Sequence, residues 1–249
     1  MKKKFTVALT GSNGAVGRHV TEELKQKNID VVKLLRPFGL TEIEEIFRSQ
    51  KNKFEVLLDL GWDTKNRSEE AQFKSASISI LLAKFCETNN VRYIFVSSLT
   101  AIDPEHSQYG KAKKYVESVM SKNGVIIRPG FVIFDKRVNV IKIKTINKQK
   151  LYIPTVGIDD LVFELLNDAI SSHANYDLNL ITGVSEIKNV FEITRYIPLL
   201  QYKIAIKVIL KILFLLRPIS IFNKAFDRFY GLLEVDDLLK RKSIKARHI

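Results

Sequence analysis

Tyr109 and Lys113 lie four residues apart within 107–122, a segment whose pattern predicts a helix, so both side chains face the same side. A phenol is a weak base at neutral pH, but a neighbouring ammonium group stabilises the phenolate and lowers its pKa. The pair can therefore exchange a proton with an alcohol or a ketone. Ser98, shortly after the apolar run 91–96, offers a hydroxyl that could hydrogen-bond the same oxygen. The alternative is a surface tyrosine–lysine pair on a charged helix.

A loop with three glycines stands between an apolar run, 5–9, and a helical pattern, 15–27. Glycine lets a backbone approach a ligand closely, and the first amides of a helix attract anions. This position predicts a cradle for the pyrophosphate of a dinucleotide. The alternative is an ordinary tight turn. The residues expected to contact the dinucleotide here are Gly11, Asn13, Gly14, Ala15, Val16 and Gly17.

Strand and helix patterns alternate along most of the chain. This alternation predicts an α/β fold with a doubly wound parallel sheet, whose strands all end at the edge where ligands bind. The predicted strands are 5–9, 30–35, 54–60, 91–96, 125–127, 151–158 and 177–181. The predicted helices are 15–27, one capped by Thr41 and Glu44, 67–88, 107–122, 160–170 and 186–196. We divide the chain into a core, 1–150, a small substrate-binding portion, 151–197, and a tail, 198–249.

The spacing Gly-x-x-Gly-x-x-Gly, followed in order by Ser98, Tyr109 and Lys113, resembles the short-chain dehydrogenase/reductase superfamily. The similarity is to its extended or atypical branch, the NAD-dependent epimerases and dehydratases, and it covers residues 5–196. The resemblance implies a Rossmann fold that binds NAD or NADP. Further segments that resemble this branch are Asp59-Leu60-Gly61, Arg128-Pro129-Gly130-Phe131, Ile153-Pro154 and Ile158-Asp159-Asp160-Leu161.

The resemblance also implies roles for single residues. Tyr109 is the expected proton carrier, Lys113 lowers its pKa and bonds the nicotinamide ribose, and Ser98 bonds the reacting oxygen. Leu60 and Gly61 run along the cofactor ribose. Pro129 belongs to the strand end that packs against the nicotinamide. Asp159 or Asp160 is expected to cap a helix, a more favoured reading than contact with substrate.

Two arginines bear on the choice of cofactor. Arg18 directly follows the third glycine, and Arg36 ends the second predicted strand, where an acidic residue would bind the ribose hydroxyls of NAD. Arginines near the ribose favour a 2′-phosphate, so we expect NADP, with NAD as the alternative. For Arg18 the competing interpretation is a solvated helix face.

The chain departs from the pattern of the family in three places. No strand is predicted between Arg36 and Phe54, and the acidic residue near the adenine is missing with it. Lys74 falls near the position of an asparagine in the family. The spacing from Ser98 to Tyr109 is compact, which indicates a trimmed substrate loop. These departures bear on substrate size and on the proton path.

The function expected from the resemblance is that of a 4-keto-sugar reductase or a 4-epimerase in bacterial surface polysaccharide synthesis. Its substrate would be a sugar linked to a nucleotide or to a polyprenyl diphosphate. The Tyr–Lys pair does not separate reductase from epimerase. The alternative is a non-catalytic NADP-binding sensor or assembly protein on the same fold. Residues 226–237 faintly resemble the endings of such sugar enzymes.

The formal charge is +13, and the segment 196–249 carries +7 of it. Lys203, Lys207 and Lys211 repeat every four residues in an apolar stretch, which predicts a basic amphipathic helix lying in an anionic membrane interface. The alternatives are a helix packed on the body or in a homodimer interface. A nucleic acid is the least favoured partner, because the tail is too apolar for one.

The single cysteine, Cys86, lies in an apolar helical pattern and is expected to be a small buried hydrophobe. One cysteine allows no disulfide within the chain, which suits a cytoplasmic protein, peripheral on the inner face of the membrane. The four histidines are scattered without the spacing of metal ligands, so no metal site is expected.

Overall fold

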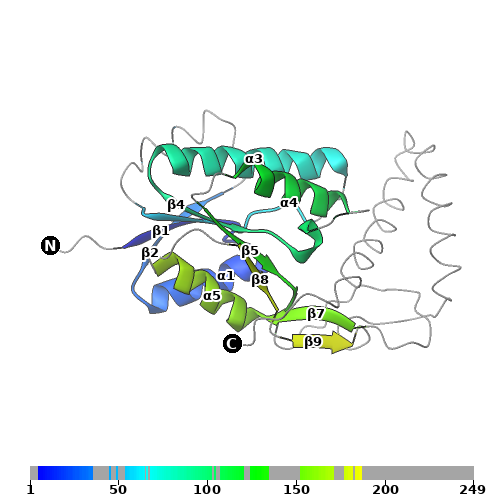
Figure 1. Ribbon diagram of the computed structural model, residues 1–249. Coiled ribbons are helices and arrows are strands. Elements are labelled where there is room, and N and C mark those ends of the chain that lie inside the picture. The colour runs from blue at the N-terminus through cyan, green and yellow to red at the C-terminus, as the bar shows by residue number, and fades with distance from the viewer. Residues whose placement is uncertain are drawn as a thin grey trace, which may run out of the picture.

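A six-stranded parallel sheet forms the centre of the protein, with the strand order β2-β1-β3-β4-β5-β8 (Figure 1). The computed structural model describes residues 5–35, 45, 49, 54–64, 66, 68–102, 104, 107–120, 124–134, 152–170, 177–181 and 183–186. The strands are β1 (Thr6–Thr10), β2 (Asp30–Leu34), β3 (Val56–Asp59), β4 (Arg92–Val96), β5 (Gly124–Pro129) and β8 (Asp177–Leu180). The predicted α/β class and parallel sheet are confirmed.

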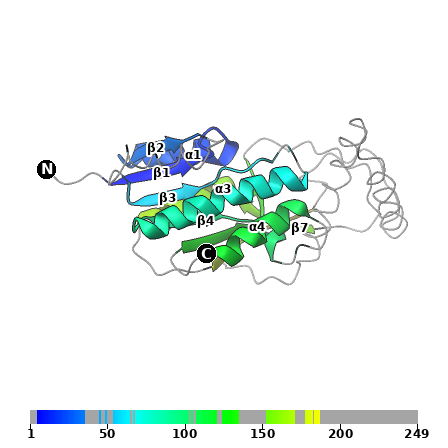
Figure 2. The same cartoon turned by 90° about the horizontal axis from the view of Figure 1, so that it is seen from above.

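Helices cover both faces of this sheet (Figures 1 and 2). On one face α1 (Ala15–Gln26) packs beside α5 (Ile158–Ile170), and on the other α3 (Glu69–Thr88) packs beside α4 (Gln108–Val119). The alternation of side chains along each strand feeds both layers, since Val7 and Leu9 join the core under α1 and α5, whereas Ala8 joins the core under α3 and α4.

Serine caps set the starts of the two helices on the second face. The Ser68 hydroxyl accepts a hydrogen bond from the Ala71 amide at 3.3 Å, and the Ser107 hydroxyl accepts one from the Gly110 amide at 2.8 Å. Helix α3 therefore begins at Glu69 and α4 at Gln108, one or two residues later than predicted. Glu69 and Glu70 in the first turn of α3 also suit the positive end of the helix.

A second, three-stranded sheet lies beside the first and contains β6 (Phe131–Ile133), β7 (Tyr152–Gly157) and β9 (Gly183–Glu186). Strand β7 pairs in parallel with β6 and antiparallel with β9. The sequence predicted only β7. It also assigned Glu186 to a helix, which is wrong because Glu186 closes the β7–β9 ladder opposite Tyr152. The rest of that predicted helix, 187–196, lies outside the described residues.

The strand order reverses between β1 and β3, because the chain passes from β1 to β2 on one side and then returns to β3 on the other. In doubly wound sheets ligands bind in the crevice beside the ends of such strands. Other predicted features lie outside the described residues: Arg36, the capped helix at Thr41, the strand missing before Phe54, and the tail 198–249. Within the described residues, no helix is both long and apolar enough to cross a membrane.

Candidate active site

The glycine loop brings the ends of β1 and β3 into direct backbone contact. Gly11 has φ +69°, in the left-handed region, and a Cβ there would lie 2.8 Å from the Gly61 amide nitrogen. A Cβ on Gly17 would lie 2.1 Å from the Gly11 carbonyl oxygen. Glycine is thus required at both positions, by conformation and approach at the first and by approach at the second. The predicted loop and the predicted Leu60-Gly61 segment meet here.

The start of helix α1 fits an anionic ligand. Asn13, Gly14 and Ala15 are exposed, and the first turn of α1 holds no acidic residue. Aligned peptide dipoles place partial positive charge at this end. The Ser12 hydroxyl is buried and has no hydrogen-bond partner among the described residues, so it can serve a bound group. These donors suit a pyrophosphate.

A buried network fixes the strand ends below this loop. Asp59, which is 1% exposed, accepts hydrogen bonds from the Thr10 hydroxyl and, at 2.7 Å, from the Tyr93 hydroxyl. The Thr10 hydroxyl oxygen also accepts from the Gly61 amide at 2.8 Å. Burying a carboxylate costs free energy unless hydrogen bonds of this kind compensate it. Strands β1, β3 and β4 are therefore locked together where the loop begins.

Ser98 lies just after β4, at the start of the short helix η1 (Leu99–Ala101). Its hydroxyl oxygen accepts from the Thr100 hydroxyl at 3.0 Å and from the Thr100 amide at 3.2 Å. A Cβ on Gly110 would lie 2.6 Å from the Thr100 carbonyl oxygen, so only glycine lets η1 lie against α4. Since Gly110 directly follows Tyr109, this contact brings the loop of Ser98 against the start of the helix that carries Tyr109.

The Lys113 ammonium is enclosed, with the residue 2% exposed. Its Nζ donates to the Val96 carbonyl oxygen at 2.6 Å and lies 3.9 Å from the centre of the Trp62 ring. The centres of the Phe95 and Tyr109 rings are 4.5 and 5.7 Å away. This geometry contradicts the alternative of a surface tyrosine–lysine pair. It keeps the cation beside Tyr109, which is half-buried at the first turn of α4.

Trp62 and Gln72 contribute to the site although the sequence analysis did not select them. The Trp62 Nε1 donates to the Gln72 side-chain oxygen at 2.7 Å, and the Trp62 and Tyr109 rings meet edge to face at 5.9 Å. Gln72 is fully buried on α3, whereas Lys74 on the same helix is exposed. The one available signal was the position of the only tryptophan, directly after Gly61.

The remaining predicted site residues differ in exposure. Arg18 is exposed on α1, Leu60 is half-buried and Pro129 is buried at the end of β5. Arg36 lies outside the described residues. The structure therefore places the described site residues around the ends of β1, β3, β4 and β5, and the roles of all of them stay predictions.

Asp159 and Asp160 lie in the first turn of α5, which begins at Ile158. Both are exposed. Acidic residues in this turn stabilise the helix through its dipole. Because the helix begins before both residues, neither is the N-cap that was expected, and they lie within the first turn instead.

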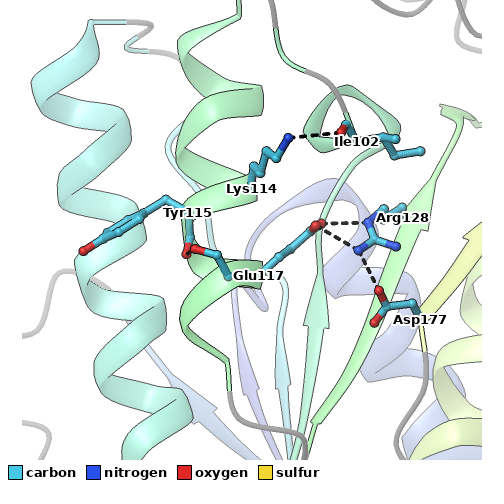
Figure 3. Close-up of polar contacts among 7 residues, drawn as sticks. Ile102, Lys114, Tyr115, Glu117, Arg128 and Asp177 are labelled. Atoms are coloured by element: carbon cyan, nitrogen blue, oxygen red, sulfur yellow. Dashed lines mark hydrogen bonds and ion pairs between the residues drawn. The ribbon is translucent and has the colours of Figure 1, made fainter.

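Arg128 holds the catalytic helix candidate, α4, against the sheet. Its guanidinium donates to both Glu117 carboxylate oxygens at 2.9 Å and to Asp177 at 2.8 Å (Figure 3). Burial alone would lower the pKa of Arg128, but the hydrogen bonds to Glu117 and Asp177 outweigh it and raise the pKa above its usual value. Arg128 thus stays charged and ties α4 to β5 and β8.

Residues 7–122 match the model of the NAD dependent epimerase/dehydratase family. No curated protein matches the chain significantly in sequence. The structure is similar to dTDP-4-dehydrorhamnose reductase of Clostridium acetobutylicum, with a TM-score of 0.60 and 16% identity over 78% of this chain and 83% of that one.

The structure is also similar to UDP-glucose 4-epimerase of Thermotoga maritima with UDP-glucose, with a TM-score of 0.61 and 16% identity over 78% of this chain and 86% of that one. For dTDP-4-dehydrorhamnose reductase of Bacillus anthracis in complex with NADP, the TM-score is 0.61 at 14% identity, over 79% of this chain and 84% of that one. At these identities the likeness shows the fold. The resemblance expected from the motifs is confirmed: residues 7–122 match the NAD dependent epimerase/dehydratase family model, and the fold is a Rossmann fold.

Proposed function

We propose that this protein is an NAD(P)-dependent reductase or epimerase of nucleotide-linked sugars. One observation carries the proposal: a buried ammonium group, Lys113, lies beside Tyr109 at the same sheet edge as the glycine loop. A surface lysine would be screened by water, whereas an enclosed one acts strongly on a neighbouring phenol. Proton exchange and dinucleotide binding are thereby brought to one edge of the sheet.

The residues at the loop fit a dinucleotide. The backbone of Gly11 to Ala15 and the start of α1 would hold the pyrophosphate, with the Ser12 hydroxyl as a further contact. Leu60 and Gly61 would border the ribose. Exposed Arg18 would meet a 2′-phosphate, so NADP is the expected cofactor and NAD the alternative. When bound, the nicotinamide would accept or supply a hydride.

The proton steps follow from the side chains. Lys113 stabilises the phenolate of Tyr109, which then accepts a proton from a sugar hydroxyl or, as the phenol, returns it to a ketone. Ser98, whose hydroxyl oxygen already accepts from Thr100, can donate its own hydrogen to the same substrate oxygen. A reductase and an epimerase both need this chemistry, so these residues serve either activity.

The similarity to enzymes of dTDP- and UDP-linked sugars supports a nucleoside diphosphate sugar as substrate. A sugar on a polyprenyl diphosphate, used in surface polysaccharide synthesis, is the narrower proposal. It rests on the basic amphipathic pattern of the tail 198–249, which would bring the protein to an anionic membrane. Flotation of the full chain with anionic liposomes at low salt tests this part. Failure to float would assign the tail to the body or to a dimer interface.

The direct test of the activity is NADPH oxidation with a panel of nucleotide-linked 4-keto-sugars, together with isomer analysis of UDP-sugars. The wild type should turn over at least one of them, and Tyr109→Phe should do so far more slowly. NAD retained through purification would favour an epimerase, and an empty site a reductase. A protein that binds NADP but turns over no sugar would be the non-catalytic sensor instead.

Cofactor preference has its own test. Replacing Arg18 with Ser should weaken NADP binding about three- to tenfold and leave NAD binding unchanged, as expected for one exposed charge. Lys25→Ser, in the last turn of the same helix, is the matched loss of a positive charge away from the loop. Equal weakening of NADP binding by both variants would indicate that Arg18 is a solvated residue with no part in cofactor choice.

A further inference from the structure

The Lys113 ammonium lies against aromatic rings from two other elements. Trp62 comes from the loop after β3 and Phe95 from β4, and their ring centres lie 3.9 and 4.5 Å from Nζ. The Val96 carbonyl accepts one hydrogen bond at 2.6 Å. Burying an ammonium group is costly unless such contacts compensate it, and an indole is the strongest of the aromatic partners.

The indole stabilises the cation through its ring quadrupole, which carries no net charge. This contribution therefore favours the charged form of Lys113 without cancelling the positive field at Tyr109. Trp62 also packs edge to face with the Tyr109 ring, at 88° and 5.9 Å between centres. One side chain thus contacts both the ammonium and the phenol.

Trp62 is itself held in place by a hydrogen bond to α3. Its Nε1 donates to Gln72 at 2.7 Å, and the Gln72 amide donates to the Asp63 carbonyl at 2.9 Å and to the Asn66 carbonyl. Gln72 is 0% exposed, so this arrangement is rigid. The buried Gln72 amide thereby holds Trp62, Asp63 and Asn66 against α3.

We propose that Trp62 is a positioning residue, which uses its π-electrons to keep Lys113 charged and directed at Tyr109, with Gln72 holding the indole in place. The inference rests on the proposed function of Tyr109 and Lys113. It assigns to the loop after β3 an electrostatic role in proton transfer, in addition to its place along the cofactor.

Because Trp62 is the only tryptophan, fluorinated tryptophans incorporated during expression alter this site alone. Each fluorine withdraws π-electron density and leaves the ring shape nearly unchanged. We expect kcat to fall by about two- to threefold per fluorine, while the KM for the sugar stays constant, as a cation–π contact predicts. A kcat that does not change across the mono-, di- and trifluoro proteins would overturn the proposal.

Fluorine also makes the indole N–H a better donor, so the series is repeated in Gln72→Leu, which lacks the acceptor. The same downward trend in kcat is expected there from a lower starting value. Trp62→Phe, which keeps a π-face, should retain more activity than Trp62→Leu by about tenfold. Equal losses in the two variants would reduce Trp62 to a packing role and refute the inference.

A readout without turnover separates this inference from the proposed function. Denaturant unfolding, followed by circular dichroism, is compared for Trp62→Leu, Lys113→Met and the double variant. The midpoint shift caused by Trp62→Leu should be smaller in the Lys113→Met background, because the ring then has no cation to stabilise. Additive shifts would overturn the inference. Full turnover by Tyr109→Phe would instead overturn the proposed function and leave the measured coupling standing.

Discussion

The glycine loop and the enclosure of Lys113 lie at the same edge of the sheet, but the loop is made of small residues and backbone groups and the enclosure of large aromatic side chains. At the loop, Gly11 and Gly17 provide space and backbone groups, and the buried Ser12 hydroxyl is proposed as a further contact. At the enclosure, large rings from three elements surround one charged side chain. The first region should not tolerate an added methyl group at Gly11 or Gly17, and the second should not tolerate the loss of a reacting group. This difference can be tested one region at a time.

The largest effect is expected from Gly17→Ala. Its methyl group would meet the Gly11 carbonyl oxygen at 2.1 Å, so the loop must open. We expect a loss of about 3 kcal/mol or more in the free energy of unfolding, with loss of NADP binding. Thermal unfolding and cofactor titration measure both.

Gly14→Ala is the matched control for that variant, because its only close contact is at 3.1 Å and its φ of −71° suits alanine. Its stability should change by less than about 1 kcal/mol. Similar destabilisation by the two variants would show that close backbone approach is not the reason why glycine is required at position 17.

Tyr109→Phe should act on the second region alone. Loss of the phenolic hydroxyl should lower kcat by about 10²- to 10⁴-fold, with unchanged NADP affinity, because the general acid–base group is removed and the loop is untouched. Tyr115→Phe on the same helix is the control, since Tyr115 is 47% exposed and packs against Phe73. If Tyr115→Phe were as inactive as Tyr109→Phe, the catalytic assignment would fail.

A smaller effect is expected where α4 is tied to the sheet. Glu117→Gln removes the charge that Arg128 meets with two hydrogen bonds at 2.9 Å, and should cost about 1–2 kcal/mol of stability. Activity should fall modestly and NADP affinity should not, since only the second region depends on α4. Lys114→Ala, which removes an exposed 3.3 Å contact to Ile102, should change stability by less than about 0.5 kcal/mol. An equal loss of stability in both variants would contradict the proposal that Arg128 ties α4 to the sheet.

The smallest effect is expected at Cys86, a buried residue of α3 near Asp59. Burial, and then the nearby Asp59, raise the pKa of this thiol well above its usual value. The thiol therefore stays protonated at neutral and mildly alkaline pH, and alkylation of the native protein should be at least about a hundredfold slower than that of the unfolded chain. Alkylation is followed by mass spectrometry. Rapid labelling of the native protein would mean that α3 unfolds locally often enough to expose Cys86.

Most strands of the main sheet could be predicted because they are apolar runs between turn residues, as in 54–60. The strands β6 and β9 were missed because they span only three and four residues and form a sheet through distant partners. Cys86 is buried, as its apolar pattern predicted.

In the site, the motif residues were predictable from their spacing, since Tyr109 and Lys113 share one helix. Trp62 and Gln72 were not, because their roles depend on how a loop folds over another helix. Thr100 and Gly110 were missed for the same reason, as their contact joins η1 to α4 across ten positions of the chain. Motifs report the groups that react, whereas the groups that hold them in place depend on packing.

The hydrogen bond between Thr10 and Asp59 has a consequence for the order of events during synthesis. It joins residues 49 positions apart, and the Gly11–Gly61 contact spans a similar distance. A growing chain therefore cannot close its glycine loop until β3 has left the ribosome, and Tyr109 follows about fifty residues later. At a synthesis rate of roughly 5–20 residues per second, the loop would precede the proton-transfer residues by several seconds. During this interval the nascent chain could bind nucleotide before it could act on a sugar.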